Sequence, residues 1–494
     1  MASDFGEKIK RGMYWTFGER ICTKIVQFIL QLILARILVP DDYGLCALLL
    51  AFVNIASIFV NSGFGAALVQ QKDADERDFS SVFYLSVSIA FFIYIVLFFF
   101  APAISGFYND ARIISLLRVI SISLIIGAYN SVQMSVLQRR MDFRHLFFAN
   151  LAGIITSAVV SIALALKGFG VWAIVLQYLI NRVVVTVVLS YLIKWHPKLL
   201  FSWKRVKSLF SFGWKCMASS FLSTVVTDVY ITVVGKFFMK SELGVYDTGN
   251  KIPSTVSETF SSSLGSVLFT SFSQMQDDKN IVRQYVAKSN QVSSFIMFPL
   301  MFGLAVCAEP LIRLLLTDKW IAAVPFMQMA CVLYSSYPLH IANINAINAL
   351  GRSDIALSNE LKKKAIDIAF LVIMVHFGLL WVAFGSMMTS IISLWINMQP
   401  NKKFLDYSTY QQLKDIAPSF TISLVMCLVM VIIELATSLV PLLLLTIQLA
   451  VALVIYFGLS YLFNKDLMRI VFRLLPISCK TCKLNQFLRK FLLE

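Results

Sequence analysis

Charged residues are scarce in this chain: they make up 14% of its 494 residues, whereas a soluble domain carries about 25%. Hydrophobic residues make up 58%, and the mean hydropathy is +0.77. This composition excludes an ordinary soluble protein. Apolar runs such as 79–103, 146–166 and 439–463 each approach the roughly 20 residues that cross a bilayer as a helix. The sequence therefore predicts an integral membrane protein.

Four further absences narrow the class of protein. No segment between the apolar runs exceeds about 17 residues, which leaves no room for a soluble domain of about 50 residues. The eight cysteines are scattered, which excludes a disulfide framework. Cys479 and Cys482 form a single CxxC motif with no histidine nearby, which gives weak support for a metal site. No cleavable signal peptide is expected, because the first apolar run is too long and too polar for one.

The net charge of +16 suggests nucleic acid as a partner, but the distribution of the charge favours a topological explanation. With the N-terminus inside, the expected inner segments carry most of the lysines and arginines, as cytoplasmic segments of membrane proteins do. We therefore expect a multi-pass protein with both termini cytoplasmic, in contact with membrane lipids and not with nucleic acid.

The apolar runs predict an all-α fold with about fourteen transmembrane helices. The expected spans are 12–38, 43–68, 79–103, 112–136, 146–166, 170–194, 208–236, 242–272, 283–308, 321–349, 354–376, 379–398, 416–437 and 440–463.

The stretch 36–70 recurs 200 residues later without a gap, so that Gly44 corresponds to Gly244 and Leu68 to Leu268. Such a repeat indicates a duplicated unit, which is typical of transporters. Six expected helices separate the copies, so the copies should be parallel and related by an axis along the membrane normal. The expected parts are an N-terminal six-helix lobe at 1–200, a C-terminal six-helix lobe at 201–405, two additional helices at 406–464 and a basic amphipathic cytoplasmic tail at 465–494.

Ionised groups inside the expected spans are the candidate functional residues, because such a group costs at least ~2.5 kcal/mol at the bilayer centre and normally faces a cavity or a partner. In the first span, Arg20, Lys24, Gln27 and Gln31 share one helix face. Lys24 lies about 18 Å along the helix from Gly12, near mid-membrane. This face predicts a wet cavity; the alternative is that the two cations extend to the inner interface.

Arg182, Asp228, Lys251 and Glu258 are the other charges expected deep in the membrane. Lys251 and Glu258 are seven residues apart on one helix, too far for a direct ion pair, so each needs another partner. The alternative is that these groups form purely structural pairs between helices. Together with Arg20 and Lys24 they predict an interior in which cations outnumber carboxylates. Such a cavity suits an anionic substrate, because arginine and lysine bind phosphate oxygens well.

Stretches in both halves of the chain are similar to those of a known family. They are ARILVPDDYGL, SGFGAALVQQKD and VLQRRMDFR in the first half, and DVYITVVGKFF, LGVYDTGNKIP and AEPLIRLLLTDKWIAAVPFMQ in the second. Over roughly residues 5–400 the chain resembles the bacterial polysaccharide or oligosaccharide flippases, also called lipopolysaccharide biosynthesis proteins, of the colanic-acid and teichuronic-acid exporter type. Their superfamily includes the multidrug exporters of the MATE type and the lipid II flippases.

The resemblance implies a MATE-like fold of two six-helix lobes around a central cavity, plus two C-terminal helices, in the bacterial inner membrane. It also implies a substrate, an undecaprenyl-pyrophosphate-linked oligosaccharide repeat unit that alternating access moves to the outer leaflet for surface polysaccharide synthesis. Cations bind the pyrophosphate in this family, and here Arg20, Lys24, Arg182 and Lys251 match that role. Polysaccharide polymerase and export machinery would be partners. No cofactor is expected, although Asp228 or Glu258 would take up a coupling H+ or Na+, or else serve as a counter-charge.

Two alternatives belong to other classes. A MATE-type exporter of small cations should have a cavity dominated by carboxylates, whereas here the cations dominate. An enzyme of the pathway would be a polymerase, which needs large arginine-rich outer loops, or an acyltransferase, which needs an intramembrane histidine. The chain lacks such loops, and only His340 and His376 are candidate histidines. We therefore expect that the chain is not an enzyme.

Overall fold

The structure is a computed structural model that describes residues 22–61, 64, 68, 75–140, 142–193, 195–274, 278–437, 439–465 and 467–469. Within these ranges the chain is helical and has no strand. It divides into two compact units, Met1–Asp247 and Thr248–Glu494, which we call the N-terminal and C-terminal units and describe separately.

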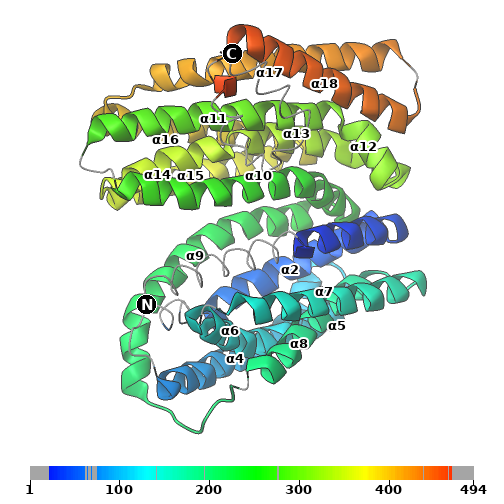
Figure 1. The fold of residues 1–494 in the computed structure, drawn as a ribbon. Coiled ribbons are helices and arrows are strands. Elements are labelled where there is room, and N and C mark those ends of the chain that lie inside the picture. The colour runs from blue at the N-terminus through cyan, green and yellow to red at the C-terminus, as the bar shows by residue number, and fades with distance from the viewer. Residues whose placement is uncertain are drawn as a thin grey trace, which may run out of the picture. The chain divides into compact units, whose positions relative to one another are not determined.

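The N-terminal unit is a bundle of long helices (Figure 1). It contains a helix at 22–37, α2 (Pro40–Asn61), α4 (Glu76–Tyr108), α5 (Arg112–Ile120), α6 (Ile122–Arg140), α7 (Phe143–Leu166), α8 (Val171–Ile193), α9 (Trp203–Phe237) and the start of α10 (Lys240–Gln274). Helix α7 packs along α8, α2 packs along α9, and α4 contacts α5 and α6.

The C-terminal unit holds the rest of α10 and the remaining helices. They are α11 (Lys279–Val306), α12 (Ala308–Leu315), the 3-10 helix η1 (Asp318–Ala323), α13 (Val324–Ser335), α14 (Tyr337–Ala349), α15 (Ser353–Met374), α16 (Leu379–Leu405), α17 (Thr409–Ala436) and α18 (Pro441–Phe463). Helix α11 packs against α13 and α17, α15 packs against α16, and α17 packs against α18. The last two helices are therefore attached to this unit through α11.

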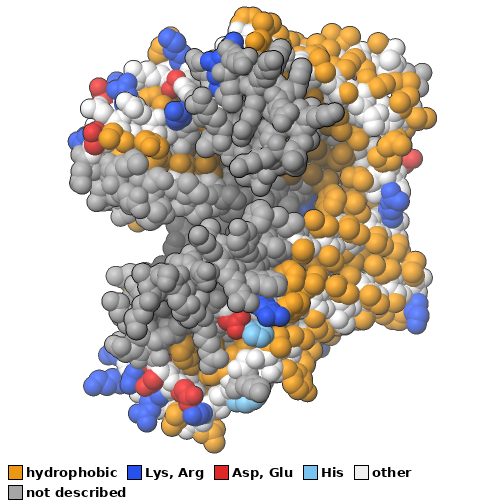
Figure 2. All heavy atoms as spheres, in the orientation of Figure 1, with side chains coloured by type: hydrophobic (Ala, Val, Ile, Leu, Met, Phe, Trp, Pro, Cys, Tyr) orange, Lys and Arg blue, Asp and Glu red, His pale blue; other side chains and the backbone are white. Residues whose placement is uncertain are grey.

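Many of these helices are long and apolar enough to cross a membrane. Among the described residues there are nine of them, and the expected total of about fourteen stays a prediction. Figure 2 shows extensive apolar surface on the described part of the chain, with charged side chains gathered in separate groups. The chain is thus an all-helical, multi-pass membrane protein, as its composition predicts.

Some expected spans differ from the observed helices. The span expected at 321–349 consists of η1, α13 and α14, with a break at Ser336. Pro338 lies in the first turn of α14. Backbone N–H groups in a first turn have no acceptor within the helix, so the absence of this group in proline breaks no helical hydrogen bond. The short helix α12 was not expected. The boundary between the compact units lies within α10, whereas the domain limits at 200 and 405 stay predictions. Most of the tail expected at 465–494 lies outside the described residues.

Helix α4 is longer than its apolar run because local hydrogen bonds cap both ends. Asp75 accepts hydrogen bonds from the backbone N–H groups of Arg77 and Asp78, each at 3.0 Å, and the Asp78 side chain accepts one from the Asp75 N–H in return. This capping box satisfies N–H groups that have no partner within the helix. At the other end Asn109 adopts the left-handed conformation, with φ of 52°.

The two repeated turns contact each other at their glycines. A Cβ placed on Gly44 of α2 would lie 2.8 Å from the backbone nitrogen of Gly244 in α10, and even closer to the carbonyl oxygen of Lys240. Reciprocally, a Cβ on Gly244 would lie 2.8 Å from the nitrogen of Gly44 and closer to the carbonyl oxygen of Pro40. The two helices therefore cross with backbone against backbone, and each copy of the repeat supplies one glycine.

A cluster of charges ties the turn after α4 to its neighbours. Asp110 forms ion pairs with Arg112, at 2.8 Å, and with Lys240, at 3.3 Å, while Arg112 also pairs with Asp41 at 2.8 Å. Burial alone would raise the pKa of Asp110, but hydrogen bonds from Arg112 and the charges of Arg112 and Lys240 lower it below its usual range. The ionised form of Asp110 therefore contributes to stability.

Candidate functional site

The helix at 22–37 places its polar residues on the side that faces the protein. A period of 3.6 residues aligns Lys24, Gln27 and Gln31 with the buried Leu34 and with Leu38, which follows the helix. The isoleucines of the opposite side, Ile25, Ile29 and Ile33, are exposed. Lys24 is nevertheless exposed, and no described acidic side chain pairs with it. Arg20, predicted to share this face, lies outside the described residues.

Arg182 on α8, like Lys24, is an exposed cation on a helix face that otherwise contains buried residues. The same face of α8 contains Val175, Val185 and Leu189, which are all buried. The exposed Val187 lies on the opposite face. Arg182 is exposed in the middle of its buried face, and no described carboxylate forms an ion pair with it. Lys24 and Arg182 are therefore exposed cations on helix faces that otherwise contain buried residues.

Asp228 on α9 is one of three buried carboxylates among the described residues of the N-terminal unit, with Asp42 and Asp78. Its residue is only 4% exposed, its side chain is hydrogen-bonded to Asn54 of α2, and its Oδ2 has no hydrogen-bond partner among the described residues. Asn54 itself is exposed. The sequence analysis missed Asn54; the only signal was a single amide within an otherwise apolar span. Within the described part of the chain, the Asp228 Oδ2 is thus an unsatisfied buried acceptor, which is costly in a protein interior.

The predicted residues of the C-terminal unit lie on α10. Lys251 is half-buried, and its carbonyl oxygen accepts hydrogen bonds from the hydroxyls of Ser254, at 3.1 Å, and Thr255, at 2.7 Å. Glu258 is exposed. Ser257 is buried and donates a hydrogen bond to the carbonyl oxygen of Tyr334 on α13, at 3.0 Å. The serines thus satisfy backbone groups locally, while Lys251 and Glu258 belong to a different unit from Lys24, Arg182 and Asp228.

The two candidate histidines have structural surroundings. His340 on α14 lies 3.2 Å from both the Ser336 hydroxyl and the Asn397 amide. His376 is exposed after α15, and its Nδ1 lies 2.9 Å from the carbonyl oxygen of Val372. Within the described ranges, no group of three or more His, Cys, Asp or Glu residues could hold a metal ion.

The fold is that of a multi-pass helical membrane protein, with exposed cations on helix faces that otherwise contain buried residues. Comparison with known proteins supports this class. The chain belongs to the polysaccharide biosynthesis protein family, whose model matches residues 33–325, more than half of the chain. The resemblance seen in the sequence is thereby confirmed.

Individual relatives agree with the family. The chain is similar to the succinoglycan biosynthesis transport protein ExoT of Rhizobium meliloti, with 29% identity over 65% of each chain. It is also similar to the teichuronic acid biosynthesis protein TuaB of Bacillus subtilis, with 26% identity over 71% of this chain and 73% of the relative. The match to ExoT thus spans slightly less than two thirds of that protein. These comparisons support the prediction that the chain is a transport protein and not an enzyme.

The fold has a counterpart among solved structures. The structure of the lipid II flippase MurJ in an inward closed conformation aligns with 91% of this chain and with all of its own, with a TM-score of 0.73 and 18% identity. At this identity the match supports the fold alone.

Proposed function

We propose that this protein is a flippase for a lipid-linked oligosaccharide. It would move an undecaprenyl-pyrophosphate-linked repeat unit from the inner to the outer leaflet of the bacterial inner membrane, by alternating access. ExoT is named a transport protein of succinoglycan biosynthesis and TuaB a teichuronic acid biosynthesis protein, which supports this choice. The termini would lie in the cytoplasm, and a polysaccharide polymerase and export machinery would act on the product.

One observation carries the proposal: Lys24 and Arg182 occupy protein-facing helix sides, are accessible, and have no described acidic partner. A cation without a counter-charge is expensive within a membrane unless water or an anion reaches it. A pyrophosphate supplies two charged groups that a lysine and an arginine can bind together. A small cationic drug would instead be repelled by these side chains, so the same observation disfavours the exporter alternative.

The coupling ion would bind at Asp228. We favour Asp228 over Glu258 because it is buried and has an unsatisfied carboxylate oxygen, whereas Glu258 is exposed and can be neutralised by water. Uptake of H+ or Na+ would remove the cost of the buried charge, so occupancy would follow the gradient.

The test measures lipid-linked glycan in each leaflet of spheroplasts from a deletion strain that expresses variants. Wild type should clear the inner-leaflet pool. Lys24→Gln with Arg182→Gln should slow clearance at least about tenfold, because each lost bond to a charged group is worth roughly 1.5–3 kcal/mol. The matched control is Lys362→Gln with Lys402→Gln, which removes two exposed lysines of the C-terminal unit. Equal effects of the two pairs would refute the cation assignment, and an unchanged pool on deletion would refute the flippase.

A further inference from the structure

The segment between α8 and α9 is fastened to the start of α4. The backbone N–H of Lys198 donates to the Ser80 hydroxyl at 3.1 Å, and that of Ser202 donates to the Ser81 hydroxyl at 3.0 Å. Trp195 is 7% exposed and packs edge-on against Phe79, with ring centroids 6.5 Å apart. This segment, residues 195–202, is therefore held against α4, and we call it the strap.

Ion pairs add to this attachment, and they pair all three acidic side chains at the start of α4. Arg205 at the start of α9 pairs with Asp78 at 2.9 Å and Asp75 at 3.4 Å, and Lys198 pairs with Glu76. Lys204 and Lys207 remain: both are exposed, and neither has an acidic partner among the described residues. The first turns of α9 thus present two unpaired positive charges next to the strap.

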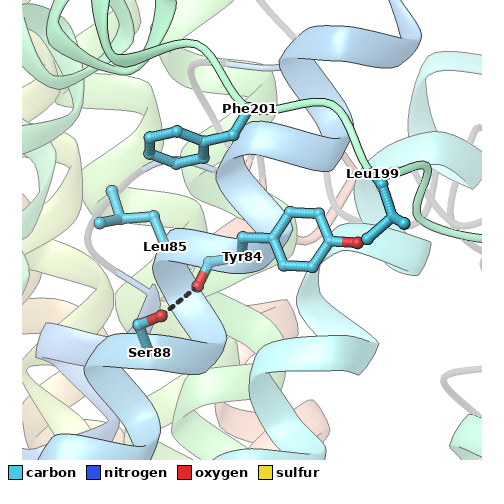
Figure 3. Close-up of a pocket in the computed structure, with 5 residues that line it drawn as sticks. All are labelled: Tyr84, Leu85, Ser88, Leu199 and Phe201. Carbon is cyan, nitrogen blue, oxygen red and sulfur yellow. Dashed lines mark hydrogen bonds between the residues drawn. The ribbon is translucent and has the colours of Figure 1, made fainter.

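A cavity of about 440 Å³ lies between the strap and α4, and one of its lining residues, Phe201, stands three residues before Lys204 in the chain. Leu199 and Phe201 extend from the strap on one side, and Tyr84, Leu85 and Ser88 project from α4 on the other (Figure 3). The Ser88 hydroxyl donates a hydrogen bond to the carbonyl oxygen of Tyr84 in its own helix, at 2.7 Å. The lining is therefore almost entirely apolar, which fits a hydrocarbon chain.

Beyond the cavity, α4 carries an exposed apolar face. Phe92, Val96 and Phe99 follow Ser88 on one face of α4 and are all exposed. Tyr84 lies about 12 Å along α4 from its first residue, which is farther than the thickness of a headgroup layer of roughly 5–7 Å. The exposed Trp203 of α9, at 65%, lies against the ring of Phe201 and suits the interface between headgroups and hydrocarbon.

We propose that this site binds one anionic phospholipid, with a hydrocarbon chain in the cavity and the headgroup phosphate on Lys204 and Lys207. The arrangement combines an apolar slot, an interfacial tryptophan and two free lysines in the order that a lipid of the inner leaflet presents chain, interface and phosphate. The bound lipid would hold the strap against α4. The proposal rests on the expected orientation of α4 with its first residue on the cytoplasmic side, and does not depend on the transported substrate.

The test titrates the full-length purified protein with phosphatidylglycerol and with phosphatidylcholine, and counts bound lipids by native mass spectrometry. The tightest phosphatidylglycerol site of wild type should be at least about tenfold tighter than any phosphatidylcholine site. Lys204→Gln with Lys207→Gln should weaken it by about 30-fold, because each lysine near an anionic lipid contributes about 1 kcal/mol. Lys362→Gln with Lys402→Gln removes the same charge elsewhere and should leave it within twofold of wild type.

A second variant tests the cavity without changing charge. Ser88→Phe fills the slot and should weaken phosphatidylglycerol binding at least about tenfold, because displacing two CH2 groups already costs this much. Its control, Ser115→Phe, replaces an exposed serine that likewise bonds a carbonyl oxygen of its own helix. If both lysine pairs had equal effects, binding would be unspecific and the proposal wrong. Full binding by Ser88→Phe would also overturn it. Neither outcome affects the flippase test, since no oligosaccharide is present.

Discussion

Gly44→Ala and Gly244→Ala each place a methyl group where α2 and α10 cross. The new Cβ would lie 2.8 Å from the nitrogen of the other glycine and closer still to a carbonyl oxygen of the other helix. Ordinary van der Waals contact begins at 3.4 Å, so the helices must separate by more than 0.6 Å. The atoms that the Cβ meets belong to the backbone, so no change of rotamer relieves the overlap. The substitution therefore acts on the contact between the two repeated turns.

Two opposed effects set the magnitude. Overpacking costs about 1–3 kcal/mol, and the upper value applies here because backbone atoms cannot turn aside. Replacing a glycine inside a helix by alanine otherwise stabilises the helix by about 1 kcal/mol. Each single variant should therefore lose about 2 kcal/mol, which lowers the midpoint of thermal unfolding by roughly 4–8 °C for a unit of this size.

The assay heats the purified protein in detergent and measures the fraction that stays monodisperse. Gly106→Ala in α4 and Gly127→Ala in α6 are matched controls, because a Cβ at either position meets nothing within 4 Å. Both controls should equal or slightly exceed wild type in stability. If Gly44→Ala behaves like the controls, the close crossing of the helices is not present in solution.

The double variant gives the sharper result. One separation of the helices relieves the overlap at both glycines, so Gly44→Ala with Gly244→Ala should cost about 2 kcal/mol, as much as either single variant. Two independent sites would instead cost about 4 kcal/mol together. Additive losses would refute the reasoning, even if each single variant were destabilised as expected.

Two further predictions concern carboxylates. Asp228→Asn should abolish the dependence of transport on the H+ or Na+ gradient while Glu258→Gln keeps it, measured as glycan flux with and without the gradient; full dependence in Asp228→Asn would exclude that residue as the coupling site. Because the pKa of Asp110 is lowered in the folded protein, its contribution to stability is complete above about pH 4 and is lost as the pH falls through the lowered value. Asp110→Asn should flatten this part of a curve of unfolding midpoint against pH, and an unchanged acid loss in that variant would contradict the assignment.

Much of the fold is predictable from the chain because membrane helices are set by the length of apolar runs. The run at 171–193, for example, was expected almost to its ends. Hydropathy does not reveal where a helix continues into water, and α4 extends beyond 79–103 because Asp75 and Asn109 cap it. It also does not reveal the break at Ser336, since residues on both sides are apolar.

The candidate site is predictable only as far as single helices allow. Helical spacing places Lys24, Gln27 and Gln31 on one face, and this face is indeed the one that continues into buried residues. Spacing along one helix says nothing about the partner of a residue on another. Asn54 beside Asp228, and the pairing of Arg205 with Asp78, therefore needed the structure. An excess of lysine and arginine indicates a side of the membrane but not which acidic groups they contact.

The glycine contact explains why the repeat survives as scattered matches. At Gly44 and Gly244 each copy faces its equivalent, so a side chain on either one would meet backbone of the other, and both positions are restricted for the same reason. Leu68 and Leu268 match for a different reason: each is buried in the hydrophobic core of its own unit. Between such positions the copies contact different neighbours or lipid, and lipid accepts any apolar residue. Two sequences under these constraints keep their equivalence at contacts and lose it elsewhere, which is the pattern that the chain displays.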